Sequence, residues 1–111
     1  MNLYEHTIVA KQSFSKSQLQ TLKEKYSGLI EKNNGEIVKI EDWGLINMSY
    51  QINKNRKGNY IHIKFKGEGN TVNELEKKER IDTNLLRFLT VKVKKFDLEN
   101  EKLILKNKDQ S

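Results

Sequence analysis

The chain has 111 residues, a formal net charge of +6 and no cysteine. This length fits one domain, and the absence of cysteine excludes disulfides, thiol nucleophiles, iron–sulfur clusters and cysteine-type zinc sites. No apolar run approaches the length of a membrane span, and the first predicted strand begins at Leu3, which leaves no room for a signal peptide. We therefore expect the protein to act in the cytosol, or in an organelle that encodes it.

The first two predicted elements are a strand and a helix. Residues 3–10 alternate in the manner of a strand, with apolar side chains on both sides. Ser15 followed by Gln18 fits a capping box, so a helix should begin there, and residues 33–35 (Asn-Asn-Gly) provide a left-handed stop. The apolar residues of this helix are spaced to form one buried face: Leu19, Leu22, Tyr26, Leu29 and Ile30.

A long strand and a basic hairpin follow. Residues 36–53 are too many for an ordinary strand, and Gly44 indicates a bulge or bend, so we expect a kinked edge strand. A turn over residues 53–57 leads to a third strand that begins at Gly58. On that strand the face opposite the aliphatic residues carries Tyr60, His62 and Lys64.

The excess of positive charge is concentrated in this hairpin. Residues 54–66 hold five cations and no acid, whereas residues 1–53 are neutral. One interpretation is a solvated turn whose cations only maintain solubility. A compact cationic hairpin beside aromatic and imidazole rings instead favours a polyanion with stackable rings, so we expect RNA rather than a membrane. The expected RNA-binding residues are Lys54, Arg56 and Lys57, with Lys64, Tyr60 and Lys92 as further candidates.

A second helix should follow the third strand. Asn70 or Thr71 can cap it, and Thr71 with Glu74 again fits a capping box. The apolar stripe of this helix is thin, so we expect it to be poorly amphipathic. We expect its acidic residues to form a solvated face: Glu74, Glu76 and Glu79.

Residues 85–95 predict a fourth strand, which completes the order β-α-β-β-α-β. This order is typical of the α+β ferredoxin-like fold, a four-stranded antiparallel sheet with two helices on one face. The domain should span residues 1–95. We expect the charged tail, residues 96–111, to be mobile in the isolated protein.

The uncovered face of such a sheet should be polar in a monomer, yet apolar side chains are expected on it. Sheets do tolerate single exposed apolar residues. A larger apolar set indicates instead that a protein or stacked bases cover the face. The residues that we assign to a protein-facing surface are Tyr4, Val9, Tyr60 and Val91.

Signals for catalysis are weak. His6 and His62 are the only histidines, and no acid or hydroxyl lies at a spacing that suggests a triad or a metal site, so we expect structural or contact roles. The acylphosphatase-type enzymes share this strand order but need an arginine in the loop after the first strand, and residues 11–14 contain none. We therefore expect no enzymatic activity, cofactor, metal or small-molecule substrate.

Five fragments, in order and on the same frame, resemble protein six of the bacterial small ribosomal subunit: Leu3-Tyr4-Glu5-His6, Glu41-Asp42-Trp43-Gly44, Ser49-Tyr50-Gln51-Ile52-Asn53-Lys54, Lys57-Gly58 and Arg87-Phe88-Leu89-Thr90-Val91-Lys92. The likeness runs from about residue 3 to residue 95. It implies a non-enzymatic protein that binds the central domain of small-subunit rRNA together with ribosomal protein eighteen, in a bacterial or organellar ribosome. The second helix of that family usually carries an apolar residue where this chain has Glu79.

Two other functions stay open at this point. Lys57-Gly58 before an aromatic-bearing strand resembles part of the motif of free-standing RNA-recognition modules, although Asn59 and Ile61 replace its expected aromatics. A regulatory module that dimerises through its sheet and binds a small ligand is the third possibility, and it leaves the charge of the hairpin unexplained. Binding that is insensitive to salt would favour the ligand-binding module, and binding of isolated single strands through Tyr60 would favour the recognition module.

Overall fold

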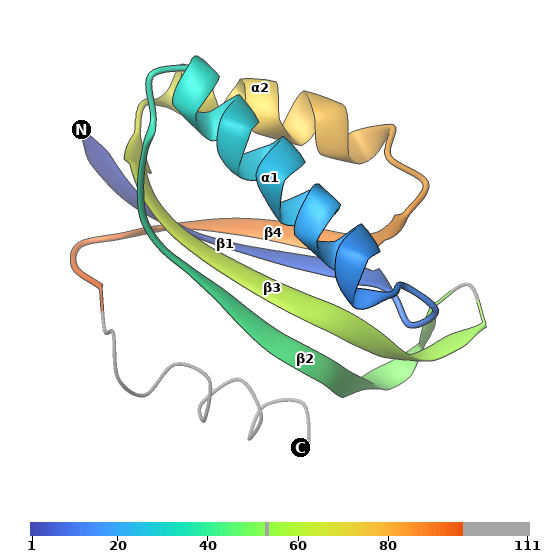
Figure 1. Cartoon of the computed structure of the whole chain (residues 1–111). Coiled ribbons are helices and arrows are strands. Elements are labelled where there is room, and N and C mark those ends of the chain that lie inside the picture. Colours follow the sequence, from blue (N-terminus) through green and yellow to red (C-terminus); the bar gives the residue numbers. More distant parts are fainter. Residues whose placement is uncertain (53, 97–111) are drawn as a thin grey trace.

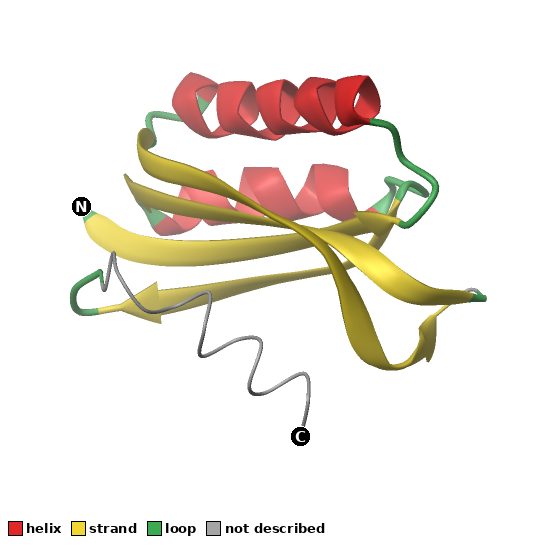
Figure 2. Ribbon diagram, turned by 60° about the horizontal axis from the view of Figure 1, so that its bottom comes forward, coloured by secondary structure: helices red, strands yellow, loops and turns green. Residues whose placement is uncertain are grey.

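A computed structural model describes residues 1–52 and 54–96 (Figure 1). Its elements follow the predicted order: β1 (Asn2–Lys11), α1 (Lys16–Lys32), β2 (Glu36–Ile52), β3 (Asn55–Gly67), α2 (Gly69–Arg80) and β4 (Leu85–Val93). The strands form one antiparallel sheet in the order β2-β3-β1-β4, and Figure 2 shows both helices on one face of it. The ferredoxin-like prediction is therefore confirmed. The tail that we predicted to be mobile spans residues 96–111, and all of it after residue 96 lies outside the described residues.

The main core fills the space between the helices and the sheet. Strand alternation divides the side chains of β1 and β3 between this layer and the opposite face, as the sequence pattern predicted. Burial of each large aliphatic side chain stabilises the fold by about 1.5–3 kcal/mol, which keeps the helices packed on this face. The opposite face of the sheet is therefore the one left for other contacts. Its buried members are Tyr4, Ile8, Ala10, Leu19, Leu22, Tyr26, Ile30, Ile61, Ile63, Phe65 and Leu75.

Helix α1 begins and ends as predicted. The Ser15 hydroxyl accepts a hydrogen bond from the Gln18 backbone N–H at 3.2 Å, and the Gln18 side chain accepts one from the Ser15 N–H at 2.8 Å, which completes the capping box. After the helix, Asn34 adopts a φ of 66°. The next residue must be glycine, because a Cβ at Gly35 would lie 2.5 Å from the Cγ2 atom of Ile30.

Helix α2 differs from its prediction. It begins at Gly69, and its N-cap is Glu68 rather than Asn70 or Thr71. The Thr71 hydroxyl is used differently: it accepts from the Glu68 backbone N–H at 3.3 Å and donates to the Asn33 carbonyl at 2.8 Å. Thr71 therefore ties the first turn of α2 to the end of α1, a contact that no local pattern reveals.

The buried stripe of α2 is thin in apolar residues, as predicted, because Leu75 is the one apolar residue in it. It consists of Thr71, Leu75 and Glu79, spaced four residues apart. The side chain of Glu79 is only 1% exposed, so the expectation that it belongs to a solvated face is wrong. A buried carboxylate is tolerated at this position because His6, on β1 of the sheet, is its hydrogen-bond partner.

A second, smaller core lies on the sheet face away from the helices. Strand β2 is an edge strand with a register shift between Asp42 and Gly44, and Gly44 adopts a φ of 79°, which confirms the kink. Trp43, the extra residue of this bulge, is buried against Val9 and Tyr60. The sequence led us to expect Val9 and Tyr60 on an exposed surface. That expectation is wrong, because both side chains pack with Trp43 in this core.

Candidate nucleic-acid interface

The end of the β2–β3 hairpin presents three exposed cations, Lys54, Arg56 and Lys57. They line one side of a hollow of about 470 Å³. Gln12 and Ser13, from the loop between β1 and α1, line the same hollow together with Leu45 of β2. The fold thus places the predicted basic cluster beside a polar loop that is more than forty positions away in the sequence (Figure 1).

Two hydrogen bonds join this loop to the hairpin. The backbone N–H of Gln12 donates to the Oδ1 atom of Asn55 at 3.2 Å. The backbone N–H of Lys57 donates to the Oε1 atom of Gln12 at 3.2 Å. The backbone register of β1 with β3 runs only as far as Lys11 and Gly58, so these side-chain amides continue the connection beyond the end of the pairing.

Lys54 has an unusual backbone conformation for its residue type. Its φ of 65° lies in the left-handed region, which side chains other than glycine, asparagine and aspartate adopt at a cost of about 1–2 kcal/mol. A glycine would fit this turn without that cost. Strained backbone tends to occur where a side chain has a function, and here the side chain supplies an exposed cation at the tip of the hairpin.

The three further RNA-binding candidates are not part of this cluster. Lys64 is 1% exposed, and its Nζ atom lies 3.8 Å from the Oε1 atom of Glu41. Tyr60 is buried in the second core. Their expected exposure at an RNA surface is therefore wrong, because side chains of β2 pack against them, Glu41 against Lys64 and Trp43 against Tyr60. Lys92 is exposed but pairs with Tyr4, at the opposite end of β1 from the hairpin tip.

The predicted protein-facing residues are also separated. Tyr4 lies in the main core, where its ring centroid is 5.3 Å from that of Phe65, so its assignment to the open face is wrong. Val91 is 46% exposed, and its neighbour on the same face, Leu89, is 57% exposed. These two residues of β4 pair with Glu5 and Thr7 of β1, on the face away from the helices. They form the β4 apolar pair referred to below.

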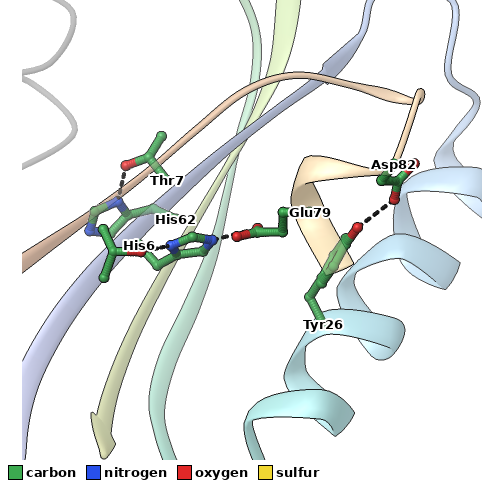
Figure 3. A network of polar contacts seen from close by, with 7 residues as sticks. His6, Thr7, Tyr26, His62, Glu79 and Asp82 are labelled. Atoms are coloured by element: carbon green, nitrogen blue, oxygen red, sulfur yellow. Dashed lines mark hydrogen bonds and ion pairs between the residues drawn. The ribbon is translucent and has the colours of Figure 1, made fainter. Parts of the chain in front are cut away.

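His6 has a structural role, as the sequence predicted, but sequence reasoning missed its buried polar partners. Its Nε2 atom lies 2.6 Å from the Oε2 atom of Glu79, and its Nδ1 atom lies 2.6 Å from the Oγ1 atom of Thr90 (Figure 3). Burial raises the pKa of the Glu79 carboxyl, and His6 opposes that rise. The sequence signal for the burial of Glu79 was its position four residues after Leu75, which places both side chains on the same face of α2. This pair is a structural contact under α2, remote from the hairpin tip.

His62 lies on the opposite face and is kept neutral. Its ring stacks on Trp43 with centroids 4.5 Å apart and an angle of 9° between the planes, and its Nδ1 atom is 3.0 Å from the hydroxyl of Thr7. Burial, with a contribution from the positive charge of Lys64, lowers the pKa of His62 to about 4. His62 therefore carries no positive charge near neutral pH and cannot act there as a cationic phosphate contact.

Within the described ranges, no group of three or more histidine, cysteine, aspartate or glutamate residues could hold a metal ion. Among the described residues, neither helix has the length and apolar character that a membrane crossing requires.

Comparison with known proteins gives consistent matches over most of the chain. The family model described as Ribosomal protein S6 matches residues 3–92. A small ribosomal subunit protein bS6 from Pelagibacter ubique (strain HTCC1062) is 64% identical over 99 residues, which are 89% of this chain and 82% of that protein. The protein of the same name from Caulobacter vibrioides is 43% identical over 99 residues, 89% of this chain and 79% of its own. The crystal structure of 30S ribosomal protein S6 from Thermotoga maritima superposes with a TM-score of 0.79 at 28% identity, covering 94% of this chain and 96% of the other.

Proposed function

The chain belongs to the ribosomal protein S6 family, and from this premise we propose that it binds the central domain of small-subunit rRNA together with ribosomal protein eighteen. The family and its bacterial relatives make it a structural, non-enzymatic constituent of the small subunit of a cytoplasmic ribosome. The proposal concerns the finer questions of which surface contacts RNA and which contacts a protein partner.

The observation that carries the RNA proposal is the exposed cluster of Lys54, Arg56 and Lys57 at one end of the sheet. Flexible cations that project from a hairpin tip suit the phosphates of a folded RNA, which supply most of the affinity of such contacts. The burial of Tyr60 argues against the alternative of a free-standing recognition module, because a buried ring is not available for stacking on bases.

The β4 apolar pair supports the partner proposal. Leu89 and Val91 lie side by side on the open face of an edge strand, and both are about half exposed. The second core already buries Val9 and Tyr60, so the apolar surface left for a partner on this face lies toward β4. Protein eighteen is the expected occupant because it is the partner that the resemblance to this family implies.

The test is RNA binding across a salt series. Purified protein is titrated against the central-domain rRNA with and without protein eighteen, in parallel with the Lys54→Ala/Arg56→Ala/Lys57→Ala variant. If each lost cation removes about 0.7–0.9 from the slope of log K against log salt concentration, the variant should flatten the slope by about 2–3. We expect wild-type binding to depend on protein eighteen.

The chain offers a matched control in Lys77→Ala/Lys78→Ala/Arg80→Ala, which removes two lysines and one arginine that are exposed on α2. These cations lie on the helix side of the molecule, so the control should keep the wild-type slope. Equal flattening by both variants would mean that only net charge matters and that the hairpin is not the contact. Equal binding to any single-stranded RNA without protein eighteen would contradict the proposed function.

A further inference from the structure

The hairpin tip is weakly held by its own strand β2. From Gly44 to Asn47, β2 pairs with β3 in an unbroken register that ends at Asn47 and Lys57. The next pair is Ile52 with Asn55, and a register shift lies between them. The basic residues therefore lie where the β2–β3 ladder is irregular. Strand pairing alone does not hold their backbone in one position.

The loop after β1 supplies the missing connection through side-chain amides. Asn59 donates from Nδ2 to the Lys11 carbonyl at 2.8 Å, next to the last backbone pair. Beyond it, Asn55 accepts from the Gln12 N–H and Gln12 accepts from the Lys57 N–H. An amide side chain can replace a backbone group in such a series because it carries a donor and an acceptor at similar spacing. We refer to the reciprocal contact of Gln12 with Asn55 and Lys57 as the amide clamp.

The amide clamp fixes the two ends of the basic segment. Asn55 follows Lys54 directly, and it also donates from Nδ2 to the Ile52 carbonyl at 3.2 Å, across the turn. Lys57 is held through its own backbone N–H. Arg56 lies between these two anchored positions. The clamp thus holds the backbone N–H of Lys57 and the side chain of Asn55, while Lys54, Arg56 and Lys57 line the hollow.

We propose that Gln12 and Asn55 are positioning residues that hold Lys54, Arg56 and Lys57 in a common geometry for the RNA backbone. This inference rests on the proposed function. Ordering a segment before association removes part of the entropy that binding would otherwise lose, so the clamp raises affinity without contacting phosphate.

The experiment measures binding to the central-domain rRNA in the presence of protein eighteen, across salt, for Gln12→Ala, Asn55→Ala and the double variant. Each single variant should bind about five- to tenfold more weakly, which is the effect expected when a few ordered side chains become free. The slope against salt should stay at the wild-type value because all cations remain. The double variant should be at least as weak as the weaker single variant, because the two substitutions remove different hydrogen bonds. Gln12→Ala removes the bond from the Lys57 N–H, and Asn55→Ala removes the bond from the Gln12 N–H.

The matched control is Gln20→Ala, which makes the same change on the exposed side of α1, where the Gln20 amide donates to Glu24 at 3.2 Å. It should bind like the wild type. Hydrogen exchange of the Lys57 amide in the free protein provides a second measurement, since Gln12→Ala should accelerate it relative to Gln20→Ala.

Four results would overturn the inference. The first is binding by Gln12→Ala within twofold of Gln20→Ala, and the second is binding by Asn55→Ala within twofold of that control. The third is a flatter salt slope for Gln12→Ala, and the fourth is an unchanged exchange rate of the Lys57 amide. The failure of the wild type to bind the RNA at all would overturn the proposed function together with this inference, whereas the first four results leave the proposed function in place.

Discussion

His62 links the stability of the fold to pH. In the folded chain its pKa is lowered to about 4, whereas a histidine in an unfolded chain titrates near its ordinary value of 6.5. As pH falls from about 6.5 toward 4, the unfolded chain therefore binds a proton that the folded chain does not, and stability is lost. The full contribution is present above pH 6.5 and amounts to about 3 kcal/mol. The charged or titratable groups that act on His62 are Lys64, Glu41 and His6.

Replacement of His62 by phenylalanine tests this coupling. The variant keeps a flat ring against Trp43 but cannot bind a proton, so between pH 7 and pH 4 its free energy of unfolding should fall by about 3 kcal/mol less than that of the wild type. Urea unfolding followed by circular dichroism at each pH measures the difference, and the other titrating groups are common to both proteins. Parallel pH profiles would contradict the predicted burial of a neutral His62.

At the scale of the element, the bulge of β2 depends on Gly44. A Cβ added there would meet no atom within 4 Å, yet its φ of 79° disfavours an L side chain. Gly44→Ala should therefore destabilise the fold by about 1–2 kcal/mol through the backbone alone. The matched control is Gly28→Ala, also without a neighbour within 4 Å but in the middle of α1, where alanine should stabilise by about 0.5–1 kcal/mol.

Urea unfolding of both glycine variants checks this prediction, and the emission of Trp43, the only tryptophan, reports whether the bulge still buries the indole. An unchanged stability for Gly44→Ala would mean that the bulge can form without the left-handed conformation.

Local patterns predicted the elements because their signals lie within a few residues. The capping box of Ser15 and Gln18 is an example, and so is the bulge at Gly44. What could not be predicted are contacts between distant elements. The charged residues around Glu79 in α2 predict that it is solvated. Its burial is explained by the contact with His6, which lies 73 positions earlier in the sequence. The N-cap of α2 was misplaced for the same reason, because Thr71 is engaged by the end of α1.

For the candidate site too, local features could be predicted from the sequence and contacts between distant elements could not. Charge density alone pointed to Lys54, Arg56 and Lys57, and the fold brings them together around one hollow. Strand alternation also gave the correct face for Tyr60, but it contains no information about what lies above that face. The bulge in β2 decides this, because it turns Trp43 over the ring. The role of Gln12 was equally hidden, since its partners come from β3.

At the scale of the whole molecule, the RNA and protein contacts are predicted at separate places on the sheet. Leu89→Ser/Val91→Ser should weaken assembly with protein eighteen on the RNA about tenfold, because exposed apolar side chains at an interface lose their burial. The salt slope should not change, since no cation is removed. Titration of the three-component assembly measures both quantities.

The control for this variant is Ile81→Ser, which removes an apolar side chain that is 76% exposed beyond the end of α2, away from the open face. It should assemble like the wild type. Equal assembly of the β4 variant and the control would place the protein contact outside the β4 apolar pair.

The strand order β2-β3-β1-β4 also has a consequence for the way in which the chain folds. The strand β1, which precedes the other described strands in the sequence, is a central one, and its neighbours β3 and β4 follow much later in the chain. His6 and Thr90, which lie side by side in the sheet, are 84 positions apart. Closing contacts over such distances is slow compared with forming a helix or a hairpin. Helix α1 and the β2–β3 hairpin can therefore form early. The edges of β1 stay unpaired until β3 and then β4 pair with it.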